Sequence, residues 1–577
     1  MRLSSEVGKA PRLRSLGDGR RSKVERRRLF FERQRGLPDA SRSPEGTVPS
    51  RAVAATRRGV GGPPKLPYLR AFRSRRKRAV APAAAPPLWQ PLGPTLIREG
   101  QTYGTARTPV SGRVSRVALD PGDEAHILLA TAGGGVWETR DGGQTWAPRT
   151  DFQPTLSTGA IAFAPSDPRI VYCGTGEGDT SSQLGVGVLR SSDGGTTWAL
   201  RPHSLLEGVG FYDIVVDPGD ADHLWAGTFR HLLESRDGGA RWRAVRSGCH
   251  WTIALRPGNP KEMLVASDRG LALSKNGGRT WKAIGLGGLV PRGDYDRMAV
   301  AYAPSDGRVV YAFAAIGDAA YLWRRATSNG PFVRQELPDD LDVTQAWYDW
   351  CLAVQADDPN VVYLGAIELY RGRRSGASWT WRNVSSRRVG DSIHPDQHAI
   401  VTSPGWPRLL LVGNDGGVFR SRDRGGSWES LNPGLGITEF EFLAQHPTST
   451  SWILGGTQDN GTLRHKGNGE WEHVADGDGG DCGIDEVRPD ACYHSYYGMG
   501  LERSDRRGDR DSWFTVGPSS GLPSLFYPPF EARGRILAQA GSDLMISTTG
   551  GQPWTNVPLE QTDPGNDTYG SALAIPA

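Results

Sequence analysis

The stretch "HPDQH" at residues 394–398 holds three side chains that can bind a metal ion or move a proton. An apolar run, "AIVT", follows it, so the stretch leads into a predicted strand. Because side chains alternate along a strand, Asp396 and His398 are expected to point the same way, with His394 in the loop above them. The three residues are candidate ligands of a divalent metal, either calcium or a transition metal. Alternatively they form an acid–base pair, or they only cap the turn.

Further acids stand in three Gly-rich loops: Glu177 in "GTGEGD", Asp415 in "GNDGG", and Asp459 beside Asn460 in "TQDNGT". Two carboxyl groups that face each other can hydrolyse a glycosidic bond, if they lie about 5 Å or about 6.5–9.5 Å apart. The candidate catalytic residues are therefore Glu177, Asp396, His398, Asp415 and Asp459.

The loop "DGDGGD" at 476–481 offers Asp476, Asp478 and Asp481 as oxygen ligands for Ca²⁺. It lacks the full spacing of an EF-hand and the distal Glu. A plain acidic loop is the alternative interpretation.

A repeated motif shows which elements position these residues. "TRDGGQTW" (139–146) recurs as "SSDGGTTW" (191–198), "SRDGGARW" (235–242), "SKNGGRTW" (274–281), "SRDRGGSW" (421–428) and "STTGGQPW" (547–554). Weaker copies end at Phe332, Trp379, Trp471 and Trp513. Each unit contains short apolar runs separated by Pro and Gly turns, which predicts four antiparallel strands. Such units, repeated about ten times, predict an all-β protein with the β-propeller fold.

We expect a single ten-bladed ring, with two smaller rings as the alternative. A division into seven and three blades is disfavoured, because three blades cannot close a ring. The expected propeller spans residues 86–577, and its end segments 88–94 and 569–577 complete one blade.

In a blade, the start of the first strand and the loop between strands two and three share one face, and the repeated motif lies at the opposite face. We therefore expect a ligand-binding site, for a carbohydrate or a peptide, on the first of these faces. The residues named there for ligand binding are Arg113, Tyr212, Asp213, His250, Trp251, Asp296, Tyr348, Asp349 and Asn460; Asp294, Arg297, Trp350, Glu439 and Glu441 fall on the same face.

The repeated motif resembles the Asp-box, or BNR repeat, of sialidases, xyloglucan-active glycoside hydrolases and sortilin-like receptors. The motifs "GTGEGD", "HPDQH", "GNDGGVFRS" and "TQDNGT" together resemble bacterial BNR proteins described as sialidase-like or glycoside-hydrolase-like. The resemblance implies a propeller, a carbohydrate-active function and a secreted or envelope location. The sequence departs from sialidases because it contains no "RIP" stretch. The motifs around the two facing Asp residues of xyloglucan-active enzymes are not evident either.

Three functions stay open. The first is glycosidic hydrolysis by paired carboxylates, and the second is a non-catalytic propeller that binds a peptide or protein. The third is a metal-dependent enzyme that acts on a peptide or small molecule through His394, Asp396 and His398.

Charge separates the N-terminal part from the rest. Residues 1–80 contain 23 Lys and Arg against 6 Asp and Glu, whereas the whole chain has 68 against 63. Residues 1–85 are predicted to be a disordered basic arm that could contact an anionic partner.

No standard signal peptide and no membrane span are evident, so a cytoplasmic location is also open. Five cysteines without paired spacing indicate free thiols, and we expect a monomer.

Overall fold

The computed structural model describes residues 91–102, 107–180, 183–287, 295–385, 392–467, 470–518, 522–559 and residue 573. The predicted basic arm at 1–85 lies outside the described residues. The closing strand predicted at 569–577 does too, apart from Leu573.

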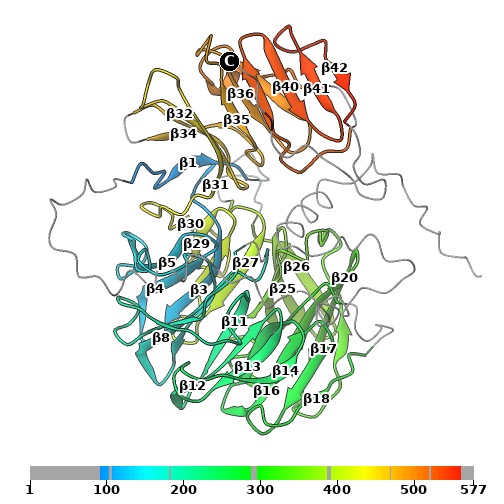
Figure 1. Ribbon diagram of the computed structural model, residues 1–577. Coiled ribbons are helices and arrows are strands. Elements are labelled where there is room, and N and C mark those ends of the chain that lie inside the picture. Colours follow the sequence, from blue (N-terminus) through cyan, green and yellow to red (C-terminus); the bar gives the residue numbers. More distant parts are fainter. Residues whose placement is uncertain are drawn as a thin grey trace, which may run out of the picture.

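Ten four-stranded antiparallel sheets and one two-stranded sheet make up the described part of the chain. This confirms the predicted all-β propeller architecture and the number of units. Seven sheets, β3 to β30, form the lower body in Figure 1, here called the ring, and three sheets, β31 to β42, form the upper body, here called the arc. The described residues contain no helix that is long and apolar enough to span a membrane.

The strands of the ring follow in chain order, four to a blade. They are β3 (Val114–Asp120), β4 (Asp123–Thr131), β5 (Gly135–Thr139), β6 (Ala147–Pro148); β7 (Thr158–Ala164), β8 (Asp167–Thr175), β9 (Val188–Ser191), β10 (Ala199–Arg201); β11 (Phe211–Asp217), β12 (Asp220–Thr228), β13 (His231–Ser235), β14 (Arg243–Ser247); β15 (His250–Arg256), β16 (Asn259–Ser267), β17 (Gly270–Ser274), β18 (Lys282–Ala283); β19 (Arg297–Ala303), β20 (Asp306–Ile316), β21 (Ala319–Arg325), β22 (Val333–Gln335); β23 (Cys351–Val354), β24 (Val361–Gly365), β25 (Leu369–Ser375), β26 (Ser378–Asn383); β27 (Gln397–Thr402), β28 (Leu410–Asn414), β29 (Gly417–Ser421), β30 (Glu429–Ser430).

The remaining elements belong to the arc and to a hairpin before the ring. They are β1 (Ile97–Gly100), β2 (Thr108–Val110); β31 (Phe440–Gln445), β32 (Ile453–Thr457), β33 (Gly461–His465), β34 (Trp471–Ala475); β35 (Cys482–Ile484), β36 (Cys492–Ser495), β37 (Leu501–Ser504), the 3-10 turn η3 (Arg510–Ser512), β38 (Phe514–Thr515); β39 (Phe530–Arg533), β40 (Ile536–Ala540), β41 (Leu544–Ser547), β42 (Thr555–Val557).

The expectation of a single ten-bladed ring is wrong, because the ring closes after seven blades. The first strands contact one another in sequence from β3 to β27, and β27 contacts β3 as well as β23. Each ring blade consists of four consecutive strands, so no blade is shared between distant segments. The described part of segment 88–94 forms no strand; the carbonyl of Leu92 accepts a hydrogen bond from Trp471 Nε1 at 2.9 Å.

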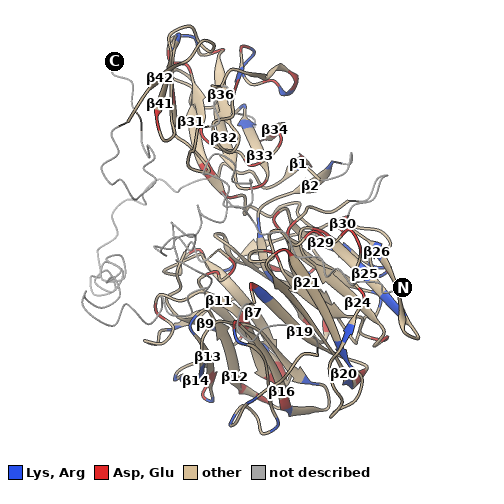
Figure 2. Cartoon of the chain, turned by 90° about the vertical axis from the view of Figure 1, so that its right-hand side faces the viewer, with Lys and Arg blue, Asp and Glu red and all other residues tan. Residues whose placement is uncertain are grey.

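The chain leaves the ring through residues 431–439, which include Pro433 and Gly434, with φ of 86° at Gly434. Gly434 N donates to Thr95 O at 3.0 Å, so the segment before the ring fixes this connection. The hairpin β1–β2 lies between the two bodies (Figure 2), where β1 contacts β34 of the arc and β2 contacts β30 of the ring.

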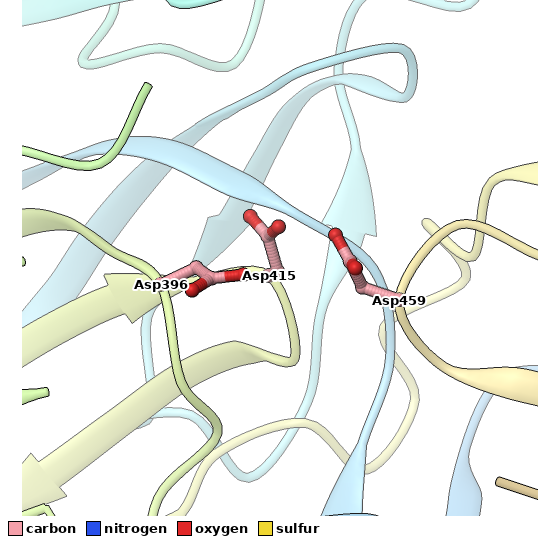
Figure 3. Close-up of side chains that lie close together, drawn as sticks. All are labelled: Asp396, Asp415 and Asp459. Carbon is pink, nitrogen blue, oxygen red and sulfur yellow. The ribbon is translucent and has the colours of Figure 1, made fainter. Parts of the chain in front are cut away.

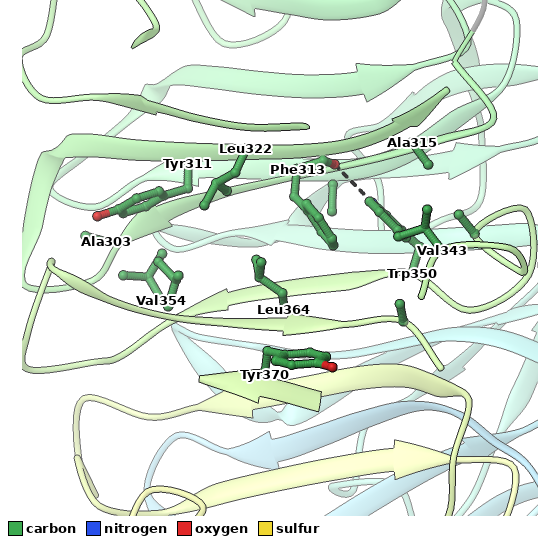
Figure 4. Close-up of a cluster of buried hydrophobic side chains, with 14 of the residues drawn as sticks. Ala303, Tyr311, Phe313, Ala315, Leu322, Val343, Trp350, Val354, Leu364 and Tyr370 are labelled. Atoms are coloured by element: carbon green, nitrogen blue, oxygen red, sulfur yellow. Dashed lines mark hydrogen bonds between the residues drawn. The ribbon is translucent and has the colours of Figure 1, made fainter. Parts of the chain in front are cut away.

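The core consists of apolar layers between neighbouring blades. Between the blades β19–β22 and β23–β26, Tyr311, Phe313, Leu364 and Trp350 are buried together (Figure 4). The rings of Phe313 and Trp350 stack with centroids 3.8 Å apart, and Trp350 Nε1 donates to Phe313 O at 3.0 Å. This layer holds the start of β23, and with it the preceding residues 347–350, in a fixed place.

The repeated motif is a structural turn between the third and fourth strands, as predicted. In its first copy, Asp141 Oδ1 accepts hydrogen bonds from the backbone N–H groups of Gln144 and Thr145, each at 2.9 Å. Gly142 and Gly143 have φ of 71° and 89°, which favours glycine. Trp146 Nε1 donates to Leu431 O at 2.7 Å and so joins the first blade to the seventh.

The five cysteines are free, as predicted: four are buried and Cys249 is partly exposed.

Candidate functional site at the junction of ring and arc

The predicted polar face of the ring meets the arc, and their contact region is here called the junction. His394 Nε2 lies 3.1 Å from Asp459 O, and Asn460 Nδ2 donates to Asp415 O at 2.9 Å. These contacts join the seventh blade of the ring to the first blade of the arc. The loops "HPDQH", "GNDGG" and "TQDNGT" are thereby brought together.

A shift of register at the start of the first strand recurs in several blades. It occurs in β11 between Phe211 and Asp213, in β27 between Gln397 and Ala399, and in β31 between Phe440 and Phe442. Such bulges redirect a side chain, and they are common beside active sites. The intervening residues are Tyr212, His398 and Glu441, so His398 and Glu441 occupy equivalent positions in neighbouring blades.

Three aspartates meet at the centre of the junction (Figure 3). Carboxylate oxygens of Asp396, Asp415 and Asp459 all lie within 4.8 Å of one another. The residues are buried, with exposures of 4%, 1% and 6%. Asp396 and Asp459 have φ of 63° and 57°, a conformation that aspartate adopts more readily than most residues. We call these three residues the aspartate cluster.

The cluster is held from the ring side by charged and aromatic groups. Tyr348 Oη donates to Asp415 Oδ2 at 2.5 Å and accepts a hydrogen bond from Arg113 Nη1 at 2.6 Å. His398 Nε2 lies 2.7 Å from Asp415 Oδ1. Burial raises the pKa of Asp415, and the nearby Asp459 raises it further. These contacts fix the position of the Asp415 carboxyl group.

A buried ion-pair group lies beside the cluster, at the top of the ring channel. Asp179 pairs with Arg297, with Arg116 Nη1 at 3.3 Å and with His398 Nδ1 at 3.4 Å. Asp179 was not singled out from the sequence, although it belongs to the quoted motif "GTGEGD". Its partners are far away along the chain, so only the fold shows its role.

Below this group, the ring axis holds a cavity of about 150 Å³. Its lining includes Arg116, Tyr212, Trp251, Arg297, Trp350 and His398.

Two glutamates lie at a more open part of the junction. The side chain of Glu439 is 28% exposed, and its Oε2 lies 3.9 Å from Arg113 Nη2. Burial raises the pKa of Glu441 to about 7, and Glu439 adds to the shift. Burial also raises the pKa of Glu439, while Arg113 opposes that change. The sequence placed both residues on this face but gave them no catalytic role.

Comparisons with known proteins point to the same architecture. No family model matches the chain. A curated oligoxyloglucan reducing end-specific xyloglucanase from Emericella nidulans is 26% identical over 163 residues, which is 25% of this chain and 20% of that protein. The match thus spans only a fifth of the relative's length.

Among solved structures, an ancestral GH74 enzyme is similar with a TM-score of 0.54 and 15% identity, over 82% of this chain and 85% of that one. The GH74 xyloglucanase from Xanthomonas campestris gives a TM-score of 0.49 and 16% identity, over 77% and 80% of the two chains. The similarity to the first structure shows a shared fold.

The remaining catalytic candidate, Glu177, caps its own loop. Its Oε1 accepts from Asp179 N at 2.8 Å, and its Oε2 accepts from Thr180 Oγ1. Arg113 Nη2 lies 3.9 Å away from Glu177 Oε2. Glu177 therefore shapes the loop that carries Asp179.

In the structure, the two histidines of the predicted metal-binding set His394, Asp396 and His398 contact other groups. His394 directs Nδ1 to Pro395 O and Nε2 to Asp459 O, both at 3.1 Å, while His398 lies between Asp179 and Asp415. In the described residues, the ligand atoms that converge belong to Asp396, Asp415 and Asp459.

The acidic loop "DGDGGD" spreads its side chains apart. Asp476 forms a two-bond ion pair with Arg107, at 2.6 and 2.8 Å. Asp478 is buried, and Asp481 caps the backbone N–H groups of Cys482 and Phe530. In the described residues, the converging ligand group does not include these three acids.

The other predicted ligand-binding residues divide into two groups. Arg113, Tyr348 and Asn460 contact the aspartate cluster or its loops. Tyr212, Asp213 and Trp251 line the channel cavity, and burial raises the pKa of Asp213 to about 6. The others take part in local structure or are buried. His250 Nδ1 contacts Gly248 O, Asp296 accepts a hydrogen bond from Gly317 N, and Asp349 is buried. Asp294 lies outside the described residues.

Proposed function

We propose that the protein hydrolyses glycosidic bonds at the junction, with Glu441 and Glu439 as the two carboxyl groups. The observation that carries the proposal is the pair of glutamates whose pKa values are raised at a partly exposed position between ring and arc. Perturbed acids at such a position favour acid–base catalysis. The xyloglucanase similarity supports carbohydrate as the substrate class.

The two glutamates would have different roles. Glu441, with a pKa of about 7, is protonated in a large share of molecules near neutral pH, and it donates this proton to the leaving glycosidic oxygen. Burial raises the pKa of Glu439 and Arg113 opposes that rise; in its ionised form Glu439 would supply the second carboxylate. The proposal therefore differs from the set predicted from the sequence, which is Glu177, Asp396, His398, Asp415 and Asp459.

A glycine-rich loop lies beside Glu439, and an aromatic side chain lies beside Tyr348, which binds Arg113. A Cβ added at Gly133 would lie 3.9 Å from Glu439 Oε1, so the loop "TAGGG" presents no side chain there. Trp347 is half-buried, and its ring centroid lies 5.5 Å from that of Tyr348. A flat aromatic face of this kind can pack against a sugar ring.

The proposal is tested with a panel of polysaccharides and oligosaccharides, xyloglucan first, using release of reducing ends as the readout. We expect the wild-type protein to cleave at least one member and Glu441→Gln to lose that activity. Glu531→Gln is a matched control, because burial also raises the pKa of Glu531, which lies on β39 of the arc. Absence of cleavage across the panel by folded wild-type protein would overturn the proposal.

Binding without cleavage is the second candidate. It is favoured by the burial of Glu177, Asp396, Asp415 and Asp459, which leaves few acids within reach of a ligand at the junction. Calorimetric titration with the same panel distinguishes the two candidates, since this candidate expects heat of binding without product.

A further inference from the structure

We propose that the aspartate cluster is a calcium-binding site that fastens the arc to the ring. Its ligands would be the carboxylates of Asp396, Asp415 and Asp459, completed by side-chain amide oxygens of the loop 457–461. The proposal does not depend on hydrolysis at Glu439 and Glu441.

The arrangement of the carboxylates is the first argument. Asp396 and Asp415 come from the seventh blade of the ring, and Asp459 comes from the first blade of the arc. Their oxygens converge within 4.8 Å although all three residues are buried. Ionised carboxylates so close together repel one another, and a divalent cation between them removes the repulsion.

Two amide side chains next to Asp459 supply an independent argument. Gln458 is 5% exposed and its Nε2 donates to Asp459 Oδ2 at 2.8 Å, so this side chain lies against the cluster. Its Oε1 is buried and has no hydrogen-bond donor. Asn460 is anchored through Nδ2 on Asp415 O, and its Oδ1 is likewise buried without a donor. Buried amide oxygens of this kind are ordinary ligands of Ca²⁺.

The positive groups beside the cluster are shared with other side chains. His398 lies between Asp415 and Asp179, at 2.7 and 3.4 Å, and therefore divides one positive charge between two carboxylates. Arg113 reaches Asp415 through the hydroxyl group of Tyr348. Gln345 Nε2, a neutral donor, contacts Asp396 Oδ1 at 3.2 Å.

The chemistry of the ligands selects the ion. All candidate ligand atoms are oxygens, which favours a hard cation over the transition metal that a histidine set would bind. The cluster offers several carboxylate oxygens in an irregular arrangement, and Ca²⁺ accepts six to eight ligands with flexible geometry. Mg²⁺ requires a near-octahedral set and retains waters, so we expect it to bind more weakly.

The test uses the full chain, freed of metal on a chelating resin, and isothermal titration with CaCl₂, MgCl₂ and MnCl₂. We expect about one equivalent of Ca²⁺ to bind and the thermal unfolding midpoint to rise with Ca²⁺. Asp415→Asn and Asp459→Asn should each weaken Ca²⁺ binding at least about tenfold. Asp476→Asn, in the loop "DGDGGD", is the control and should bind as wild type does.

Gln458→Leu provides a second variant that leaves the three carboxylates in place, and we expect it also to bind Ca²⁺ more weakly. No binding heat and no shift of the unfolding midpoint at millimolar Ca²⁺, Mg²⁺ or Mn²⁺ would overturn the proposal. Unchanged Ca²⁺ binding by folded Asp459→Asn protein, or loss of binding in Asp476→Asn alone, would overturn it too.

Discussion

The two ends of the blades use acidic side chains in opposite ways. In the repeated turns, Asp141 accepts hydrogen bonds from Thr145 and from nearby backbone groups, and these lower its pKa to about 2. At the junction, burial and neighbouring acids raise the pKa of Glu441 to about 7. An acid surrounded by donors stabilises a turn, whereas one surrounded by carboxylates holds a proton that it can transfer.

The largest expected effect is on catalysis. Glu441→Gln removes the proton donor, so we expect hydrolysis of the substrate found by the panel to fall by about 10²- to 10⁴-fold. Asp141→Asn, at the other end of the blades, should leave the rate unchanged. Steady-state kinetics of both variants make the comparison; equal losses in the two would show that the ends do not differ in function.

A smaller effect is expected on stability, and here the repeated turn is the sensitive end of the blade. Asp141→Ala removes acceptors of two backbone N–H groups and should lower the free energy of unfolding by about 1 kcal/mol. Asp151→Ala, at an exposed acid in the loop that follows the same blade, is the control and should change it by less than about 0.5 kcal/mol. Urea unfolding monitored by tryptophan fluorescence measures the free energy of unfolding of both variants, provided that the transition is two-state. If Asp151→Ala lowers this free energy as much as Asp141→Ala does, the turn has no special role in stability.

A third effect is the dependence of stability on pH. The folded protein holds the Glu441 proton up to about pH 7, whereas the ordinary value for glutamate is 4.5. Because the folded state binds more protons between these values, this group lowers stability as the pH rises from about 4.5 to 7. The environment of Glu441 includes Glu439, Asp459 and Asp478, which raise its pKa, and Arg113, which lowers it.

Glu441→Gln should therefore gain stability relative to wild type as the pH rises through that window. Asp141 acts in the opposite direction, since its lowered pKa contributes stability above about pH 4 that is lost as the pH falls toward 2. Unfolding midpoints of the wild type, Glu441→Gln and Asp141→Ala between pH 3 and 8 measure the two trends. A constant difference between Glu441→Gln and wild type over this range would contradict the first.

Local features of the fold could be predicted from the sequence, and long-range closure could not. The turn at Asp141 depends on neighbouring residues, so its Gly pair and Trp146 identify it without further context. Ring closure depends on contact between β3 and β27, which are far apart in the chain, and on the connection at 431–439. The spacing of the ten units varies without a break after the seventh, so it contains no signal for where the ring ends.

In the candidate site, too, the loops could be predicted from the sequence, but the long-range contacts of their side chains could not. The loops that carry Asp396, Asp415 and Asp459 were predicted to share a face, and they do meet. Their side-chain partners could not be predicted, because Arg297 reaches Asp179 and Asn460 reaches Asp415 only after the blades assemble. The bulge that redirects Glu441 also depends on pairing between β31 and β32.

The pH dependence of kcat/KM for the cleaved carbohydrate tests the central claim most directly. If Glu441 donates the proton, wild-type activity falls tenfold per pH unit above about pH 7, as this group ionises. The residual activity of Glu441→Gln should lack that decline, while Glu531→Gln should keep it. Wild-type activity that stays level from pH 6 to 9, or a Glu441→Gln profile with the wild-type shape, would contradict the account.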